Sequence, residues 1–177
     1  MFNYLSIIRV YAKSIFELAK EEKKIDNWEN MLFFSVEISR NFQIKKLFSG
    51  VLSSEYTARV FITLCGNQIN LQFQNLIKIM AENKRLHLLK NVLSEFIYLK
   101  NNYNGIIEAK IISSQALNEL QIHHIFFFLK KKFNRKINLK YNIDSSIIDG
   151  FIIKINNMVI DMSIRGRLKQ LENFLNY

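Results

Sequence analysis

The side chains that could do chemistry form no catalytic or metal-binding pattern. His123 and His124 are adjacent, so on a helix they point about 100° apart and cannot easily hold one metal ion. His87 stands apart, and no cysteine or carboxylate lies at ligand spacing near these histidines. There is no glycine-rich phosphate loop, no serine nucleophile elbow and no obvious catalytic carboxylate pair. The sequence therefore predicts no catalytic residue, no cofactor and no metal.

The single cysteine, Cys65, excludes an internal disulfide and a cysteine-based zinc cluster. We interpret it as a small core residue in a protein of a reducing compartment. No apolar run approaches the roughly 20 residues of a membrane helix, and the first residues do not have the pattern of a signal peptide.

The chain is basic, with 25 Lys and Arg against 15 Asp and Glu. Such a charge suits nucleic acid or an acidic membrane surface. The densest run, residues 130–136, could bind phosphate, but cations in the last turn of a helix also favour the helix dipole. The run lacks interleaved aromatic residues for base stacking, and the richness in Ile, Asn, Lys and Phe is typical of an AT-biased genome. We favour the solvated helix end, and keep a basic two-domain nucleic-acid-binding protein as the alternative function.

The stretch from Gly150 to Leu168 organises the C-terminal end. Two apolar runs flank Asn156-Asn157, a pair that suits the tight turn of a hairpin. Asp161 and Ser163 then offer oxygens that can cap a helix. Strand, turn, strand and helix are predicted in that order.

The Arg165-Gly166-Arg167 segment opens this last helix. Gly166 would allow close packing of the helix on the sheet. The two arginines could be solvated, pair with Asp161 or contact an acidic partner surface, and the sequence does not separate these alternatives.

This stretch resembles the C-terminal signature of the delta subunit of F-type ATP synthases, called the oligomycin-sensitivity-conferring protein in mitochondria. The matching residues are Gly150, Ile160, Asp161, Ser163, Arg165, Gly166, Arg167 and Leu168. Asp149, Asn156-Asn157 and Met162 depart from the pattern. Tyr11-Ala12-Lys13 with Phe16-Glu17-Leu18-Ala19 resembles the family's first helix, and Asn83-Lys84-Arg85-Leu86 its Asn-x-Arg-Leu turn.

Apolar residues at helical spacing predict helices through the first hundred residues. We expect them over residues 4–22, 25–40, 42–48, from Ser53 or Ser54 to Gly66, over 69–80 and 86–97. Trp28 is expected as a core anchor of the second helix. Residues expected to face inward on the fourth are Tyr56, Val60, Phe61 and Leu64.

The first helix has two apolar stripes. One should seal the bundle: Leu5, Ile8, Ala12, Ile15 and Ala19. The second lies to one side: Tyr4, Ile7, Tyr11 and Leu18. With the neighbouring stripe of residues 69–80, including Leu76 and Met80, it would form a groove for an amphipathic helix. The alternative is that the second stripe packs inside the bundle.

The polar segment Asn101–Gly105 predicts a boundary between an N-terminal helical domain, 1–104, and a C-terminal domain, 105–177. Strand-period alternation follows at 107–111 and 137–143, with a helix between them capped by Ser113 or Ser114. The predicted fold class is α+β, with six helices followed by a small domain of about four strands and two helices.

The resemblance implies a non-catalytic subunit of the peripheral stalk. Its N-terminal domain would bind the N-terminal segments of the alpha subunits, with the beta subunits as further candidates, and its C-terminal domain would bind the b subunits. One copy per complex is implied, held at the cytoplasmic face of the bacterial inner membrane by its partners, without direct nucleic-acid contact.

Overall fold

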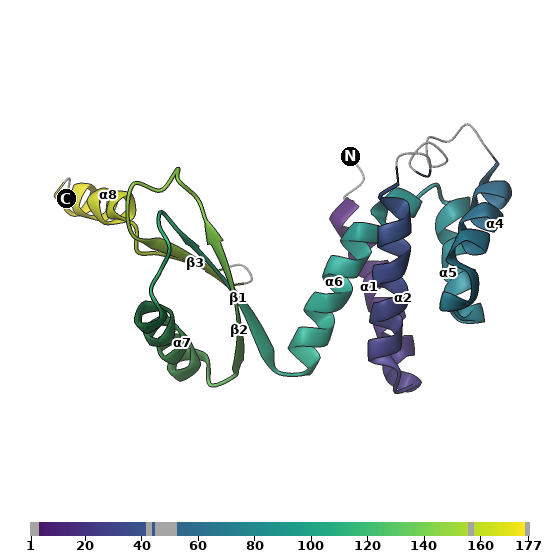
Figure 1. Cartoon of the computed structure of the whole chain (residues 1–177), viewed down its shortest axis with the longest axis horizontal. Helices are drawn as coiled ribbons and strands as arrows, with labels where there is room; N and C mark the ends of the chain where they lie inside the picture. The colour runs from purple at the N-terminus through teal and green to yellow at the C-terminus, as the bar shows by residue number, and fades with distance from the viewer. Residues whose placement is uncertain (1–3, 42–43, 45–52, 156–157, 176–177) are drawn as a thin grey trace. The chain divides into compact units, whose positions relative to one another are not determined.

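The computed structural model describes residues 4–41, 44, 53–155 and 158–175 (Figure 1). The chain divides into two compact units, residues 1–100 and 101–177. The described part of the first unit is helical, and the second contains a four-stranded sheet and two helices, which confirms the predicted α+β class. The expected helix at 42–48 and the turn residues Asn156-Asn157 fall outside the described residues, apart from Ile44.

The first unit is built from five described α-helices and two short 3-10 turns. These are α1 (Tyr4–Glu21), α2 (Ile25–Ser39), α4 (Ser54–Cys65), η1 (Gly66–Gln68), α5 (Leu71–Glu82), η2 (Leu86–Leu88) and α6 (Leu89–Tyr103). Their positions confirm the helices predicted from apolar periodicity over the described residues.

Aromatic side chains form the centre of this bundle. Trp28 is almost completely buried and contacts Phe73, with ring centroids 5.7 Å apart. Phe16 meets Phe96 edge to face at the same centroid distance. The two pairs join helices that are distant in sequence, α2 with α5 and α1 with α6. Burying one such side chain contributes roughly 1.5–3 kcal/mol to the stability of the fold. Trp28 is confirmed as a core anchor.

Helix α4 buries a different face from the one expected. Ser53 caps it by accepting a hydrogen bond from the Tyr56 backbone N–H at 3.3 Å. Thr57, Ala58, Phe61 and Cys65 are buried, whereas Tyr56 and Leu64, predicted to face inward, are exposed. The Thr57 hydroxyl donates to the Ser53 carbonyl oxygen at 3.0 Å, which satisfies its polar atom and allows its burial. Leu5 of α1, also expected in the core, is exposed.

The polar segment that suggested a boundary is mostly helical. Helix α6 continues to Tyr103, and Gly105 follows at a φ of +65°. The Gly105 N–H donates to the Asn102 carbonyl oxygen at 3.1 Å. Asn side chains at a helix end are compatible with one more turn, so most of the segment Asn101–Gly105 continues α6.

The second unit is a four-stranded sheet in the order β2-β1-β3-β4. Its elements are β1 (Ile106–Ser113), α7 (Glu119–Phe133), β2 (Lys136–Ile143), β3 (Phe151–Ile155), β4 (Met158–Asp161) and α8 (Ile164–Leu175). Strands β1 and β2 are parallel and are joined through α7, whereas β3 pairs antiparallel with both β1 and β4. Ile155 pairs with Met158, which confirms the predicted hairpin around a two-residue connection.

One face of the sheet forms the core with α7. The buried residues are Ile107, Ala109, Ile111, Ile125, Leu129, Ile153 and Ile155. On β2 the expected alternation holds only in its first half, because Tyr141 and Ile143 are exposed.

The predicted cap of α7 is wrong. Asn118, not Ser113 or Ser114, begins the helix through a capping box with Gln121. The Ser113 hydroxyl is buried instead, and its oxygen lies 2.8 Å from the Tyr141 hydroxyl oxygen. Ser113 is the last residue of β1, and its hydroxyl is hydrogen-bonded to Tyr141. The helix therefore begins later in the chain, at Glu119.

Candidate interaction surfaces

The turn after α5 is a tightly hydrogen-bonded helix end. Lys84 takes a left-handed φ of +57° and donates its N–H to the Ala81 carbonyl oxygen at 2.8 Å. The Arg85 N–H donates to the Met80 carbonyl oxygen at 2.7 Å, and the Asn83 side chain donates to that of Ile79 at 2.8 Å. These bonds satisfy the last carbonyls of the helix. The Asn-x-Arg-Leu segment is thus a structural cap that fixes the direction of Arg85.

Arg85 meets the first helix at Tyr11. Its Nη1 donates to the Tyr11 hydroxyl oxygen at 3.4 Å, and its guanidinium carbon lies 6.0 Å from the centroid of the Tyr11 ring. The two residues are 74 positions apart, and both are only partly buried. Tyr11 of the second stripe and Arg85 of the Asn-x-Arg-Leu turn therefore form one feature of the surface.

The second stripe of α1 flanks this contact. Ile7, Tyr11 and Leu18 are half-buried against the bundle core, and Tyr4 is 62% exposed. Lys13 and Glu17 form an exposed ion pair at 3.8 Å. The second stripe is therefore neither fully core nor fully solvated, as expected for a surface that can take an apolar partner.

Helix α5 contributes one of the two residues predicted for the groove. Leu76 is half-buried at the edge of the core, but Met80 is completely buried. Met80 therefore belongs to the core, and the prediction that it lines the groove is wrong. Ile79 lies three residues from Leu76 and is 49% exposed. The sequence pattern did not single out Ile79, because it lies beside the line of apolar residues 69, 73, 76, 77 and 80.

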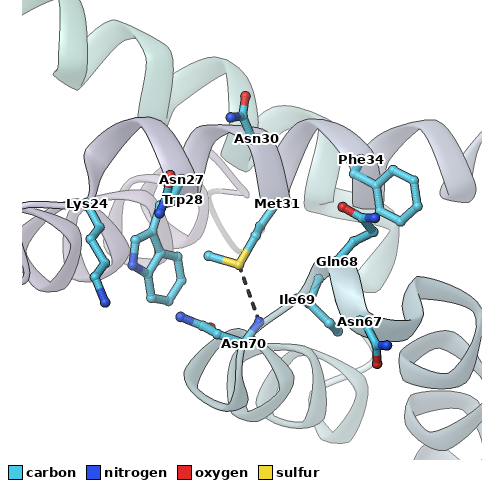
Figure 2. Close-up of a pocket in the computed structure, with 10 residues that line it drawn as sticks. All are labelled: Lys24, Asn27, Trp28, Asn30, Met31, Phe34, Asn67, Gln68, Ile69 and Asn70. Carbon is cyan, nitrogen blue, oxygen red and sulfur yellow. Dashed lines mark hydrogen bonds between the residues drawn. The ribbon is translucent and has the colours of Figure 1, made fainter.

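A separate hollow of about 390 Å³ lies between α2 and the segment from η1 to the start of α5. Figure 2 shows Trp28 and Met31 pointing from α2 toward this segment, whereas Asn30 points away. Met31 Sδ accepts a hydrogen bond from the Asn70 backbone N–H at 3.4 Å. The remaining lining is mostly amide side chains. Such groups can form hydrogen bonds but offer no acid, base or nucleophile.

In the second unit, Asp161, Ser163 and Gly166 form a compact corner where β4 passes into α8. The Ser163 N–H donates to Asp161 Oδ1 at 2.9 Å, and the Gly166 N–H donates to Ser163 Oγ at 3.0 Å. Ser163 is thus the N-terminal cap of α8, as predicted. A Cβ on residue 166 would lie 2.6 Å from Asp161 Cγ, so the predicted close packing at Gly166 is confirmed.

Gly150 supports the same corner from the other side. It has a φ of +91°, and a Cβ there would lie 2.6 Å from the Met162 carbonyl oxygen. The Met162 N–H donates to the Phe151 carbonyl oxygen at 3.0 Å, and the Ile164 N–H donates to that of Asp149 at 3.1 Å. The glycine lets the start of β3 lie against the end of β4 without a side chain between them.

The arginines of the last helix point to solvent. Arg165 and Arg167 are exposed, and within the described part of the chain no carboxylate pairs with either. The Asp161 carboxylate instead accepts a hydrogen bond from Ser163, so of the three alternatives the pairing of the arginines with Asp161 is not formed. Ile164 and Leu168 are exposed on the same helix, and Phe174 is 83% exposed. Helix α8 therefore presents both cationic and apolar side chains.

Within the described residues, the pKa shifts of two titratable groups have structural causes. Hydrogen bonds from Ser163 lower the pKa of Asp161, and burial raises the pKa of the Cys65 thiol despite its hydrogen bond with Ser35. Both groups have structural surroundings. Within the described residues, no three His, Cys, Asp or Glu side chains gather as metal ligands. Over the same residues, no helix is long and apolar enough to cross a bilayer.

A family model described as ATP synthase delta (OSCP) subunit matches residues 7–175. The chain belongs to this family. It is 40% identical over 175 residues to ATP synthase subunit delta of Klebsiella pneumoniae, and 41% identical over 175 residues to that of Escherichia coli O139:H28. Each alignment covers 99% of both proteins. A chain of the Toxoplasma gondii mitochondrial ATP synthase has the same fold, with a TM-score of 0.74 at 20% identity over 96% of this chain and 97% of that one.

Membership in the ATP synthase delta (OSCP) family makes the chain a non-catalytic subunit of an F-type ATP synthase. Its partners are other subunits of that complex. The resemblance inferred from the hairpin and arginine motif is confirmed, and the nucleic-acid alternative finds no support in these relatives.

Proposed function

We propose that the chain is the stator adaptor of its ATP synthase, joining the catalytic head to the peripheral stalk while the central stalk turns. The N-terminal unit, with its domain boundary near residue 104, binds the N-terminal segments of the alpha subunits. The beta subunits are further contacts. The C-terminal unit binds the distal ends of the b subunits. One copy serves each complex.

The proposed location is the cytoplasmic face of the bacterial inner membrane, where partners hold the chain. The Klebsiella pneumoniae and Escherichia coli relatives named above are bacterial delta subunits, which supports this location. Membrane association then depends on the other subunits.

The single observation that carries the head-binding role is the second stripe of α1. Tyr4, Ile7, Tyr11 and Leu18 follow helical spacing and remain partly or largely exposed. An amphipathic helix can lay its apolar face along such a strip. Ile79 and Leu76 of α5 are additional candidate contacts, and Asn83 and Arg85 fix the edge near Tyr11.

A few buried apolar side chains provide enough free energy to bind the alpha-subunit segment. Each well-buried apolar side chain contributes roughly 1.5–3 kcal/mol. After the costs of association, three or four such anchors can give a micromolar or tighter dissociation constant. No catalytic chemistry is needed for this role.

The test is titration of the full chain with a labelled peptide of its own alpha-subunit N-terminal segment. Tyr4→Asp and Tyr11→Asp should each weaken binding by about tenfold or more, because a carboxylate would be desolvated beneath an apolar helix. Lys13→Asp, on the polar side of the same helix, should change it little. Equal affinities for all four chains would contradict the placement of the head-binding surface on α1.

Thermal unfolding of the variants distinguishes a loss of binding from a loss of folding. Trp28 is the only tryptophan and lies in the first unit, so its fluorescence reports unfolding of that unit. Tyr4→Asp should melt like the wild type because Tyr4 is largely exposed. If both tyrosine variants unfold the unit, the second stripe is core and the proposed surface is wrong.

A further inference from the structure

The sheet face opposite the α7 core carries a row of lysines. Lys110 of β1 is paired in register with Lys140 of β2 and with Lys154 of β3. All three side chains are exposed, and they alternate with the core residues of the same strands. Neighbouring strands are about 4.8 Å apart, so the three positions span about 10 Å across the sheet. We call Lys110, Lys140 and Lys154 the lysine row.

The charge of the row is only partly balanced. Lys140 Nζ forms an ion pair with Glu108 Oε1 at 2.9 Å, and Lys154 has a coulombic interaction with exposed Asp144. Within the described residues, no carboxylate forms an ion pair with Lys110. Like charges on adjacent positions of neighbouring strands destabilise a sheet. The row therefore costs stability in the free chain, and an anion placed over it would remove that cost.

We propose that the lysine row docks an acidic helix of a partner subunit, with carboxylates three or four residues apart. Such residues are about 5–6 Å apart on a helix, which matches the spacing of the strands that carry the lysines. A helix laid across the strands would set one carboxylate near each ammonium group. This inference rests on the proposed function, in which the partner of the C-terminal unit is the b subunit.

The composition of this face favours a protein over single-stranded nucleic acid. Its other described positions are Ile106, Glu108, Ile112, Lys136, Asn138, Asn142, Ile152, Val159 and Asp161. None is aromatic, so bases have no stacking platform. Val159 is exposed and Ile106 and Ile152 are partly exposed, so they offer apolar contacts beside the row that suit an amphipathic acidic helix, whereas Ile112 is buried.

The experiment measures binding of the full chain to the purified soluble distal segment of its own b subunit. Lys110→Glu with Lys154→Glu should weaken binding by about tenfold or more at moderate salt and flatten its salt dependence. The charge-neutral Lys110→Gln with Lys154→Gln should give an intermediate loss. The matched control is Lys130→Glu with Lys131→Glu, an equal charge change on the exposed end of α7, and it should bind within about twofold of the wild type.

A melting measurement supplies a second readout. Replacing Lys110 by Gln should leave the C-terminal unit as stable as the wild type or raise its melting temperature, because a like-charge contact is removed. A large drop would assign the row a structural role and overturn the proposal.

The outcomes separate the two proposals. If the wild type does not bind the b segment, the b-binding role and the lysine row both fail. If the wild type binds and the Glu variant binds equally well, only the row is wrong. Vesicles containing phosphatidylglycerol and a dT30 oligonucleotide are the comparison probes. Tighter binding to either one, abolished in the Glu variant, would show that the row recognises phosphate and overturn the acidic-helix proposal.

Discussion

Gly166 lies directly against the carboxylate of Asp161: a Cβ on residue 166 would stand 2.6 Å from Asp161 Cγ and 2.7 Å from each carboxylate oxygen. The carboxylate is held in place because its Oδ1 accepts the Ser163 N–H at 2.9 Å. A Cβ at position 166 would therefore force the Asp161 carboxylate to move from this position. The glycine of this motif is thus explained by packing, and the flanking exposed arginines are available for a partner.

We predict that Gly166→Ala destabilises the C-terminal unit by about 1–3 kcal/mol, the usual cost of an overpacked site. Arg167→Ala should stay within about 0.5 kcal/mol, since Arg167 is exposed. Hydrogen exchange of the β3 and β4 amides measures both. In an Asp161→Ala background the alanine at 166 should cost less, because the blocking carboxylate is gone. Equal losses for Gly166→Ala and Arg167→Ala would show that the roles are assigned wrongly.

Gly150 and Gly105 form a matched pair for a second prediction. Both have a positive φ, but Gly105 has open space where a Cβ would stand, whereas Gly150 has the Met162 carbonyl oxygen at 2.6 Å. Gly105→Ala should cost about 1–2 kcal/mol from backbone strain alone. Gly150→Ala should cost clearly more, because strain and the clash with backbone add. Urea unfolding followed by a probe in each unit tests this, and a similar cost at both sites would contradict the geometry.

Lys84→Gly is predicted to stabilise the N-terminal unit by up to about 1 kcal/mol. Lys84 has a φ of +57°, which strains any residue with a Cβ, and its side chain is exposed. The increase should appear as a higher melting temperature of Trp28 fluorescence. Lys78→Gly, in the interior of α5, is the control and should destabilise by about 1 kcal/mol. A loss of stability at position 84 would mean that the Lys84 side chain contributes more than its exposure indicates.

The lowered pKa of Asp161 leads us to predict that the C-terminal unit loses a little stability in acid. Hydrogen bonds from the Ser163 hydroxyl and N–H lower the pKa of Asp161 in the fold, so the unfolded chain takes up the proton first as pH falls. Its contribution is present above the unfolded pKa of about 3.9 and is lost as pH falls through the lower folded value. Asp161→Asn keeps the shape without the titration. The stability advantage of the wild type over this variant should therefore shrink as pH falls below about 5, and an advantage that grows in acid would contradict the sign.

Features that depend on residues close together in the chain could be predicted from the sequence. The hairpin, the Ser163 cap and the glycine at the start of α8 follow from residue types at short spacing. Periodicity also identified both stripes of α1. It could not show that Met80 is buried while Ile79 is exposed, since the two are adjacent and both apolar. Which side of a helix is covered depends on neighbours from elsewhere in the chain.

Long-range features needed the three-dimensional structure. Tyr11 and Arg85 meet across 74 positions, and the lysine row exists only because β1 lies between β2 and β3 in a particular register. A shift of one residue would send the lysines of one strand to the opposite face. Alternation in the sequence shows that a strand has a polar face, but not which charges become neighbours.

The most direct test of the adaptor role is whether the full chain bridges the catalytic head and the b subunit. Purified head and the soluble b segment are mixed with and without the chain, and the complexes are sized by native mass spectrometry. We predict that head and b segment associate stably only when the chain is present, as a complex with one copy of it. The Tyr4→Asp, Tyr11→Asp double variant should retain the b segment and lose the head. Head and b segment joining equally well without the chain, or the chain binding only one of them at a time, would contradict the adaptor function.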